Sequence, residues 1–266
     1  MTLIPVLTLT TDFGSKDGFT GTMKGVIWSI CPEAQIADIS HEIAPQNVLE
    51  GAYVLWRAYP FFPSGTIHIA VVDPGVGTQR RPIVMRLGDH TFVGPDNGLF
   101  TLMLEDAEKN GWKVEILHLM NEKYFLSAVS RTFHGRDIFA PVGAHLARGV
   151  ALTDLGPFIH DPVRINIPKP ERTSTGWRAH VTVVDVFGNC ATDIPAQAVN
   201  GFTNVSFHVH GHTIQGLVET YGHKKTNEMV AVVDSEGFIE IAVVNGSAAK
   251  LLGLKVGDVL DVDLPS

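Results

Sequence analysis

Apolar runs of strand length alternate with longer segments of helical periodicity through the first half of the chain, and this alternation limits the possible folds most strongly. Strands are expected at 6–11, 36–39, 66–72 and 114–119, with a hairpin formed by 82–87 and 91–93. Helices are expected at about 17–29, 48–59, 99–104 and 138–147. Strands that alternate with helices in this way favour a mostly parallel sheet covered by helices.

The pattern of expected secondary structure changes after Pro157. Residues 166–176 contain two prolines and no apolar periodicity, which is typical of a linker. Short strands separated by turn residues follow at 177–184, 203–209, 229–233 and 238–244. We therefore predict an α/β fold class: an N-terminal, mostly parallel α/β sandwich domain (1–165), a linker (166–176) and a smaller C-terminal β-barrel-like domain (177–266).

Composition and charge limit the kinds of ligand or partner that the protein could bind and the cellular compartment in which it is expected. The formal net charge of the 266 residues is -8, which argues against nucleic acid or an anionic membrane and suits a cationic small molecule. Cys31 and Cys190 are the only cysteines, so neither a disulfide framework nor a zinc cluster is expected. No apolar run approaches the roughly 20 residues of a membrane span, and no basic segment precedes the short apolar run at the N-terminus. We expect a cytoplasmic protein.

An acid, a guanidinium and an imidazole occupy loops that follow strands or precede a helix. Asp73 and Arg80 lie in a glycine-containing loop after the apolar run 67–72, and His134 precedes the helix expected at 138–147. Such a set could turn water into a nucleophile, with Asp orienting the imidazole, His taking a proton and Arg lowering the pKa of the water. The alternative is a surface Asp–Arg pair worth roughly 0–1 kcal/mol, and Arg81 could face inward in place of Arg80.

Other polar residues suggest nucleoside binding, and each has a simpler alternative. Asp12 ends the first strand, where its carboxylate could hold both ribose hydroxyls or cap a helix. Asn189 could read an adenine edge and Phe187 could stack on the base, or both could belong to an ordinary β-turn.

His208, His210 and His212 could suggest a metal site, but no carboxylate or cysteine is spaced to complete it, which favours a solvated strand.

Six blocks in this sequence resemble, in the same order, the SAM hydroxide adenosyltransferases. These enzymes, also called SAM hydrolases (adenosine-forming), are relatives of the SAM-dependent fluorinase and chlorinase. The blocks are Thr11–Gly14, Asp38–His41, Val72–Gly77, Gly94–Gly98, Thr132–Asp137 and Asp185–Asn189. The resemblance runs from about residue 3 to about residue 264. The ordered set is specific, although each block alone is short.

The resemblance assigns roles to residues in the first domain. It implies that Asp12 holds the ribose and that Asp73, Arg80 and His134 position the attacking water. The halogenases have Tyr at the position of Asp73, and the fluorinase has Ser, which helps to hold fluoride, at the position of Gly135. The residues of this chain therefore favour water over halide as the nucleophile.

The resemblance also assigns roles to residues in the second domain. It implies that Asp185 contacts the methionine amine and that Asn189 contacts adenine. Ser235 matches a serine that holds the methionine carboxylate, but Glu236 stands where halogenases have Arg, so the partner of that carboxylate stays open. The backbone of Asn245–Gly246 corresponds to a loop that reads adenine.

The reaction that follows from this resemblance is hydrolysis of S-adenosylmethionine (SAM) to adenosine and methionine, without metal or organic cofactor. Family members are homotrimers whose sites lie between the N-terminal domain of one subunit and the C-terminal domain of its neighbour, and the same is expected here. Three alternatives stay open: a SAM-dependent halogenase, a non-catalytic adenosine- or SAM-binding protein, and a metal-dependent hydrolase of phosphoesters.

Overall fold

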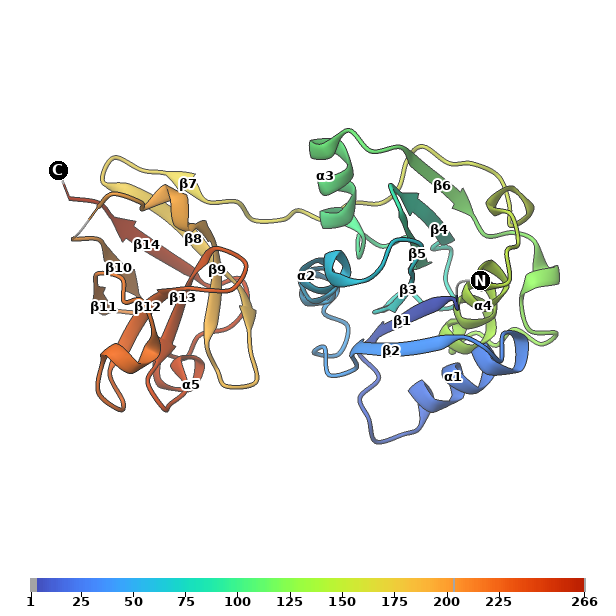
Figure 1. Ribbon diagram of the computed structural model, residues 1–266, viewed down its shortest axis with the longest axis horizontal. Coiled ribbons are helices and arrows are strands. Elements are labelled where there is room, and N and C mark those ends of the chain that lie inside the picture. The colour runs from blue at the N-terminus through green and yellow to red at the C-terminus, as the bar shows by residue number, and fades with distance from the viewer. Residues whose placement is uncertain (1–3, 203, 266) are drawn as a thin grey trace. The chain divides into compact units, whose positions relative to one another are not determined.

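The computed structural model describes residues 4–202 and 204–265. The chain divides into two compact units, Met1–Ile167 and Pro168–Ser266 (Figure 1). Within the segment expected to be a linker, Glu171–Arg172 forms the short strand β7, which pairs with β8 (Gly176–Val184) of the second unit.

A six-stranded sheet is the centre of the first unit. Its strands are β1 (Val6–Thr11), β2 (Gln35–Ser40), β3 (Ile67–Val71), β4 (Pro82–Leu87), β5 (His90–Pro95) and β6 (Val114–His118). The spatial order is β2-β1-β3-β5-β4-β6. The pairs β1–β2, β1–β3 and β3–β5 are parallel, whereas β4 runs antiparallel to β5 and β6. The sheet is therefore rich in parallel pairs, as the alternation of strands and helices predicted.

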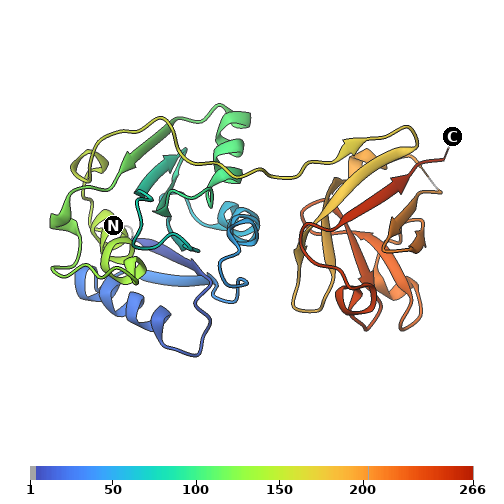
Figure 2. The same cartoon turned by 180° about the vertical axis from the view of Figure 1, so that it is seen from behind.

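Helices cover both faces of this sheet (Figures 1 and 2). The helices α1 (Phe19–Ile30) and α4 (Ala140–Ala147) lie together on one face, and α2 (Val48–Ala58) and α3 (Thr101–Asn110) lie on the other. Fully buried Leu7 and Ile69 of the sheet pack with Met23 of α1 and Val142 of α4. This apolar layer removes the strand faces from water and fixes the ends of the strands, where the candidate site residues lie.

Short helical turns complete the first unit. They are η1 (Tyr59–Phe61), η2 (Glu122–Tyr124), η3 (Gly135–Phe139) and η4 (Leu152–Asp154). The turn η3 is π-helical and leads directly into α4, so the helix expected at 138–147 is α-helical only from Ala140 onward. The helix expected at 99–104 begins later and continues to Asn110, where Gly111 ends it in a left-handed conformation.

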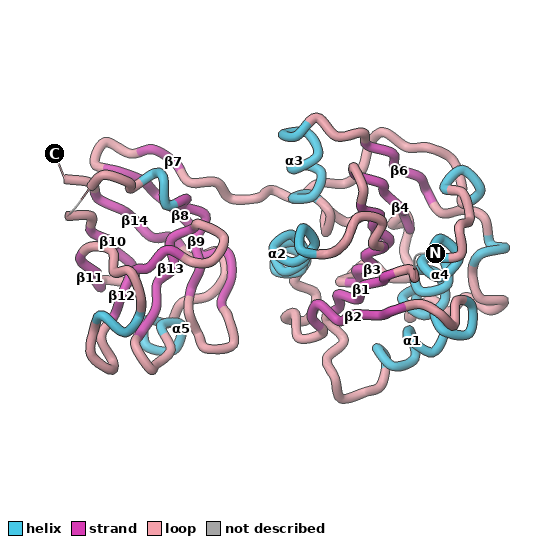
Figure 3. Tube along the Cα trace, in the orientation of Figure 1, coloured by secondary structure: helices cyan, strands magenta, loops and turns pink. Residues whose placement is uncertain are grey.

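The second unit is a nearly closed antiparallel sheet, which confirms the predicted β-barrel-like fold (Figure 3). After β8 its strands are β9 (Cys190–Pro195), β10 (Ser206–Val209), β11 (His212–Gln215), β12 (Met229–Val233), β13 (Phe238–Val243) and β14 (Val259–Asp263). Their order is β11-β10-β14-β8-β9-β13-β12. Just after β11, Leu217 forms an isolated parallel bridge with Ala231 of β12, which brings the two ends of the sheet together. A core including Val181, Phe207 and Ile241 fills the interior.

Two 3-10 turns, η5 (Ala196–Ala198) and η6 (Tyr221–His223), and the short helix α5 (Ala248–Leu252) connect these strands. The sequence analysis did not identify β9, β11, β14 or α5. It also placed three histidines on one strand, which is wrong: the chain turns back at His210–Gly211, so His208 belongs to β10 and His212 to β11. Among the helices that the structure describes, none has the length and apolar character needed to cross a membrane.

Parallel pairing brings two candidate loops to one edge of the first sheet. Thr11, the last residue of β1, lies opposite Val71, the last residue of β3. Asp12 and Asp73 follow these strand ends, and parallel neighbours end at the same edge. Open α/β sheets bind ligands at this carboxyl edge.

Candidate active site

Asp73, Arg80 and His134 form one hydrogen-bonded cluster. Arg80 donates from Nε to both carboxylate oxygens of Asp73 at 2.9 Å, and its Nη2 also pairs with Asp73 Oδ2. The same Nη2 lies 2.7 Å from Nδ1 of His134. The structure therefore brings together the three residues that were selected from separate parts of the sequence.

The charges in this cluster are shielded from water. The Asp73 and Arg80 side chains are 4% and 8% exposed, and the guanidinium lies over the Phe139 ring at 5.2 Å. The Coulombic attraction is stronger in such a place than at the surface, and the burial shows that the alternative of an exposed Asp–Arg pair does not describe this contact. Arg80 Nη1 is buried and has no hydrogen-bond partner among the described residues.

The contact with Arg80 fixes the state of the imidazole. A guanidinium can only donate, so Nδ1 of His134 must accept, and the neutral ring then carries its proton on Nε2. Burial, followed by the positive charge of Arg80, lowers the pKa of His134 below its ordinary value of 6.5. The ring is consequently neutral near pH 7, and it can take a second proton only by losing the Arg80 contact at Nδ1.

Two close approaches set the geometry of the cluster. Gly77, in the Asp73–Arg80 loop, has a φ of +75°, and a Cβ there would lie 2.2 Å from the carbonyl oxygen of Arg131. This glycine therefore lets the first loop touch the segment that leads to His134. The π-helical turn η3 starts immediately after His134, and its buried Asp137 accepts a hydrogen bond from the Ser130 backbone at 2.8 Å. Turns of this kind often occur at functional sites.

A pocket of about 370 Å³ lies beside the cluster, within the first unit. Asp12, Asp73 and His134 line it, and the rings of Phe13, Phe19 and Phe133 form an aromatic wall. The three rings meet edge to face, with centroids 5.2–6.0 Å apart. Two acidic groups among aromatic rings suit a cationic, partly apolar ligand. The sequence analysis did not identify Phe19, since a single exposed aromatic residue near a helix start carries no distinctive pattern.

Asp12 is free to serve this pocket because it does not cap the following helix. The helix α1 begins at Phe19 with Gly18 as its N-cap, and no side chain caps it. Instead, Asp12 Oδ2 accepts a hydrogen bond of 2.7 Å from the backbone N–H of Gln46, which lines the same pocket. The helix-cap alternative is therefore wrong, and the carboxylate lies at a pocket wall with further lone pairs available.

Arg81 points to a different part of the first unit than Arg80. Its Nε donates to the buried carboxylate of Asp96 at 2.8 Å, and its Nη1 and Nη2 donate to Asp161 at 2.8 and 2.6 Å. Asp96 in turn accepts from the backbone of Val163 at 2.8 Å. Of the two adjacent arginines, Arg80 contacts the Asp73–His134 cluster and Arg81 anchors the segment around residues 161–163.

In the second unit, Asp185 and Asn189 close the turn between β8 and β9. The Asn189 backbone donates to Asp185 Oδ1 at 2.8 Å, and its side-chain amide donates to Oδ2 at 3.1 Å. Phe187, at the tip, is 73% exposed, and the neighbouring Val186 is 93% exposed. The turn thus presents two large apolar side chains to solvent while its acid and amide hold each other.

The remaining candidates lie in two other turns of the second unit. A Cβ on Gly188 would lie 1.9 Å from Ser247 Oγ, so the Asp185–Asn189 turn packs against the loop that contains Asn245 and Gly246. The Asn245 amide donates to Thr226 Oγ1 at 3.0 Å, and its φ is +53°. Ser235 is exposed in the turn between β12 and β13.

Two of the three histidines considered as metal ligands, His208 and His210, make structural contacts. His208 Nε2 lies 3.2 Å from Asp263 Oδ2, and His210 donates from Nδ1 to the Leu252 carbonyl at 2.9 Å. Within residues 4–202 and 204–265, no group of three or more His, Cys, Asp or Glu side chains is placed to hold a metal ion.

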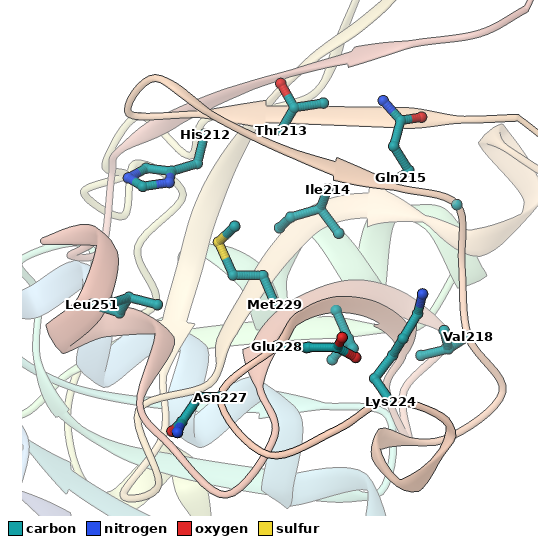
Figure 4. A pocket seen from close by; sticks show the side chains of 12 residues that line it. His212, Thr213, Ile214, Gln215, Val218, Lys224, Asn227, Glu228, Met229 and Leu251 are labelled. Atoms are coloured by element: carbon teal, nitrogen blue, oxygen red, sulfur yellow. The ribbon is translucent and has the colours of Figure 1, made fainter.

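A second cavity, of about 450 Å³, lies in the barrel-like unit between the end strands (Figure 4). Ile214 of β11 and Met229 of β12 line it, together with Lys224 and Glu228 from the connecting loop. Of the residues considered in the sequence analysis it contains His212, and it contains none of those proposed for catalysis or substrate binding. The buried ion pair, the neutral imidazole and the ribose-compatible carboxylate all belong to the first unit, which makes the 370 Å³ pocket the candidate active site.

Comparison with known proteins gives a consistent result over both units. Residues 7–156 match the family model of the SAM hydroxide adenosyltransferase N-terminal domain, and residues 179–261 match that of the C-terminal domain. A Salinispora tropica protein named (R)-S-adenosyl-L-methionine hydrolase is 39% identical over 97% of both chains. A fluorinase from Actinoplanes sp. is 30% identical, over 71% of this chain and 72% of its own.

A solved structure has the same architecture. The crystal structure of an uncharacterized conserved protein from Thermotoga maritima superposes with a TM-score of 0.89 at 38% identity, covering 97% of this chain and 99% of that one.

Proposed function

Because this chain belongs to the SAM hydroxide adenosyltransferase family, we propose that its Asp73–Arg80–His134 cluster positions a water molecule for attack on SAM. The protein is a SAM hydrolase that forms adenosine and L-methionine. The observation that supports the role of the cluster is a shielded acid–guanidinium–imidazole set on the wall of a pocket that also contains Asp12.

The chemistry is a displacement at the C5′ carbon. The positive sulfonium makes C5′ electrophilic and lets methionine leave as a neutral thioether. Oxygen of water or hydroxide forms the new bond to C5′ while the C5′–S bond breaks with its electron pair going to sulfur. One proton of the water is lost, so the net charge is conserved. Placement and desolvation of the oxygen dominate such a barrier, which makes positioning groups the main contribution of the protein.

The contacts within the cluster support a different role for each of its three residues. Asp73 and His134 line the pocket, whereas Arg80 lies behind and joins them. We assign the carboxylate of Asp73 to accept a hydrogen from the water. We assign the Nε2–H of the neutral His134 ring to hold the water or hydroxide oxygen as a donor. Arg80 then keeps both groups in place and fixes the tautomer of the imidazole, a role that differs from direct lowering of the pKa of the water.

Substrate contacts follow from the pocket and the family. Asp12 would bind the ribose hydroxyls, and the aromatic wall of Phe13, Phe19 and Phe133 would surround the region of the sulfonium. Asp185 would bind the methionine amine, Phe187 and Asn189 the adenine, and the Asn245–Gly246 backbone the adenine edge. Ser235 would hold the methionine carboxylate without help from the adjacent Glu236.

The finer features of assembly are also proposals. We assign this chain to a homotrimer in which Asp12 of one subunit and Asp185 of the next bind one SAM molecule. The exposure of Val186 and Phe187 supports this arrangement, because burial of two such side chains against a ligand or neighbour would be favourable. We expect a cytoplasmic enzyme that uses neither metal nor organic cofactor.

Oxygen-18 water tests the reaction directly. Hydrolysis at C5′ must place the label in the 5′ hydroxyl of adenosine, measured by mass spectrometry. The reaction is run with SAM whose sulfonium is in the (R) or the (S) form, because relatives are named for the (R) form. Parallel reactions contain chelator or chloride. Unlabelled adenosine, a 5′-halo product, or loss of activity with chelator would each contradict the proposed chemistry.

A further inference from the structure

The turn before helix α2 has an unusual backbone conformation. Gln46 has a φ of +67°, a left-handed value that costs a residue other than glycine about 1–2 kcal/mol. Among the described residues outside glycine, the others with positive φ are His210, Asn227 and Asn245. Two of these are asparagines, which tolerate this region well. Gln46 has no such advantage, so its conformation calls for a reason elsewhere in the structure.

Local hydrogen bonds identify the turn and hold it from both ends. The Asn47 N–H donates to the Ala44 carbonyl at 3.0 Å, which makes Pro45 and Gln46 the central residues of a β-turn. Proline followed by a residue with positive φ is the signature of a type II turn. Glu50 of α2 accepts from the Ala44 backbone at 3.2 Å and from the Asn47 amide at 3.0 Å. The first turn of α2 therefore locks the β-turn in place.

The consequence of a type II turn is the direction of its central peptide. In a type I turn that peptide group is rotated by roughly half a turn, so the N–H of the third residue points the other way. Here the Gln46 N–H donates to Asp12 Oδ2 at 2.7 Å, across 34 residues of sequence. A hydrogen bond from a fixed backbone amide to a carboxylate restricts the carboxylate to one orientation and leaves its other oxygen available.

We infer that Gln46 is a positioning residue for ribose recognition, and that its strained backbone is retained because it aims the Asp12 carboxylate at the two ribose hydroxyls. This inference rests on the proposed function, since it takes Asp12 as the ribose ligand. The residue lines the same pocket as Asp12, so the turn acts at the site itself. The group that orients Asp12 is the backbone N–H of Gln46, and the type of turn determines the direction of that N–H.

Two substitutions at Gln46 distinguish the effect of its backbone conformation from the effect of its side chain. Gln46→Gly keeps the N–H and favours positive φ, so the turn persists without the glutamine side chain. Gln46→Val keeps the N–H as well, but a β-branched residue strongly resists positive φ, which favours rotation of the central peptide. Adenosine, 2′-deoxyadenosine and 3′-deoxyadenosine serve as competitive inhibitors of SAM hydrolysis, and they differ only in the hydroxyls that Asp12 would bind.

We expect Gln46→Val to weaken inhibition by adenosine about 10-fold or more while inhibition by the two deoxy analogues changes much less, in keeping with a misdirected hydrogen bond to a charged group. KM for SAM should rise in parallel, and kcat should change little. Gln46→Gly should keep the wild-type preference for adenosine. A loss of folding alone would not change the ratio of the three inhibition constants, and thermal melting of both variants checks the folded fraction.

Other outcomes overturn the inference. If both variants keep the preference for adenosine, the turn does not aim Asp12. If both lose it, the glutamine side chain is responsible and the backbone is not. Asp12→Ala is measured alongside: if it keeps the wild-type preference for adenosine, the ribose assignment itself has failed. Failure of wild-type SAM hydrolysis would show separately, in the absence of adenosine formation.

Discussion

At the residue scale, the side chain of Arg80 determines the arrangement of the cluster. It joins Asp73 to His134 and determines which nitrogen of the imidazole carries the proton. The types of these three residues and their loops could be predicted from the sequence, because an acid after a strand end and a histidine before a helix are visible in the pattern. The order of contacts could not be predicted, since Arg80 and Arg81 are chemically alike and differ only in their packing.

Substitutions in the cluster should affect turnover more than binding. We expect Asp73→Asn, Arg80→Ala and His134→Ala to lower kcat roughly 10²–10⁴-fold, with a smaller change in SAM affinity. Because the three residues are proposed to act on one water, the double variants should lose much less than the product of the single losses. Steady-state kinetics and calorimetric binding of SAM measure the two effects.

The adjacent arginine gives the matched control for this series. Arg81→Ala removes contacts to Asp96 and Asp161 and should lower the melting temperature while kcat of the folded enzyme stays close to the wild-type value. If Arg81→Ala abolishes turnover in folded protein and Arg80→Ala does not, the assignment of the two arginines is reversed.

The imidazole predicts a specific dependence on pH. Burial and then Arg80 lower the pKa of His134 below 6.5, so the neutral ring persists as the pH falls through 6.5, and kcat/KM should decline only at lower pH. For the same reason the ring contributes stability above its unfolded pKa that is lost as the pH falls through the lowered folded value. His134→Gln keeps an acceptor for Arg80 but cannot titrate, so its remaining activity should lack this acid limb. An unchanged acid limb in that variant would assign the titration to another group.

At the scale of secondary-structure elements, long apolar patterns were informative and short strands were not. The central parallel strand β3 is buried along its whole length, so it appears as an apolar run that a sequence can reveal. The edge strand β11 contains His212, Thr213 and Gln215, all exposed, and gives no such signal. The π-helical turn η3 depends on a hydrogen bond from Ser130 to buried Asp137, a tertiary contact that local propensity does not encode.

The contact between the loop of Asp73 and Arg80 and the segment that leads to His134 can be tested at Gly77. Alanine there would place Cβ 2.2 Å from the Arg131 carbonyl oxygen at a φ of +75°, so the loops must separate. Displacement of a positioning group by about 1 Å can cost on the order of 10²-fold in rate, and we expect a loss of that order in kcat. Steady-state kinetics on folded protein measures it.

Gly65→Ala is the control for backbone strain. Gly65 has a φ of +85°, but nothing lies within 4 Å of a Cβ built there. Both variants should lose stability because alanine resists positive φ, whereas only Gly77→Ala should lose turnover. Equal losses of kcat in the two variants would show that strain, and not separation of the loops, is responsible.

At the scale of the whole molecule, the candidate residues fall into two groups on separate units. The Asp73–Arg80–His134 cluster and Asp12 belong to Met1–Ile167, and the residues proposed for methionine and adenine belong to Pro168–Ser266. A net charge of -8 on the chain favours a cationic substrate near both groups of acids. The resemblance to the family supplied the roles proposed for the second group, but the sequence of one chain does not specify which copy of that group completes a given site.

Mixing of inactive variants tests whether one SAM molecule is bound by two subunits. Asp12→Ala removes the proposed ribose ligand and Asp185→Ala the proposed ligand of the methionine amine, so each variant alone should be nearly inactive. In a mixed trimer, one interface can pair an intact Asp12 with an intact Asp185. We therefore expect activity to return after the two variants are dissociated together and reassembled, with adenosine formation as the measurement.

The controls make a negative result informative. Each variant is dissociated and reassembled by itself, and should stay inactive. Subunit exchange is verified by mass spectrometry of intact assemblies in which one variant carries a heavy-isotope label. If exchange is complete and no activity returns, both residues act within one subunit or one of them does not bind SAM. Affinity of Asp12→Ala for adenosine tests the ribose contact and affinity of Asp185→Ala for SAM tests the methionine contact; if both affinities fall, the two residues act within one subunit.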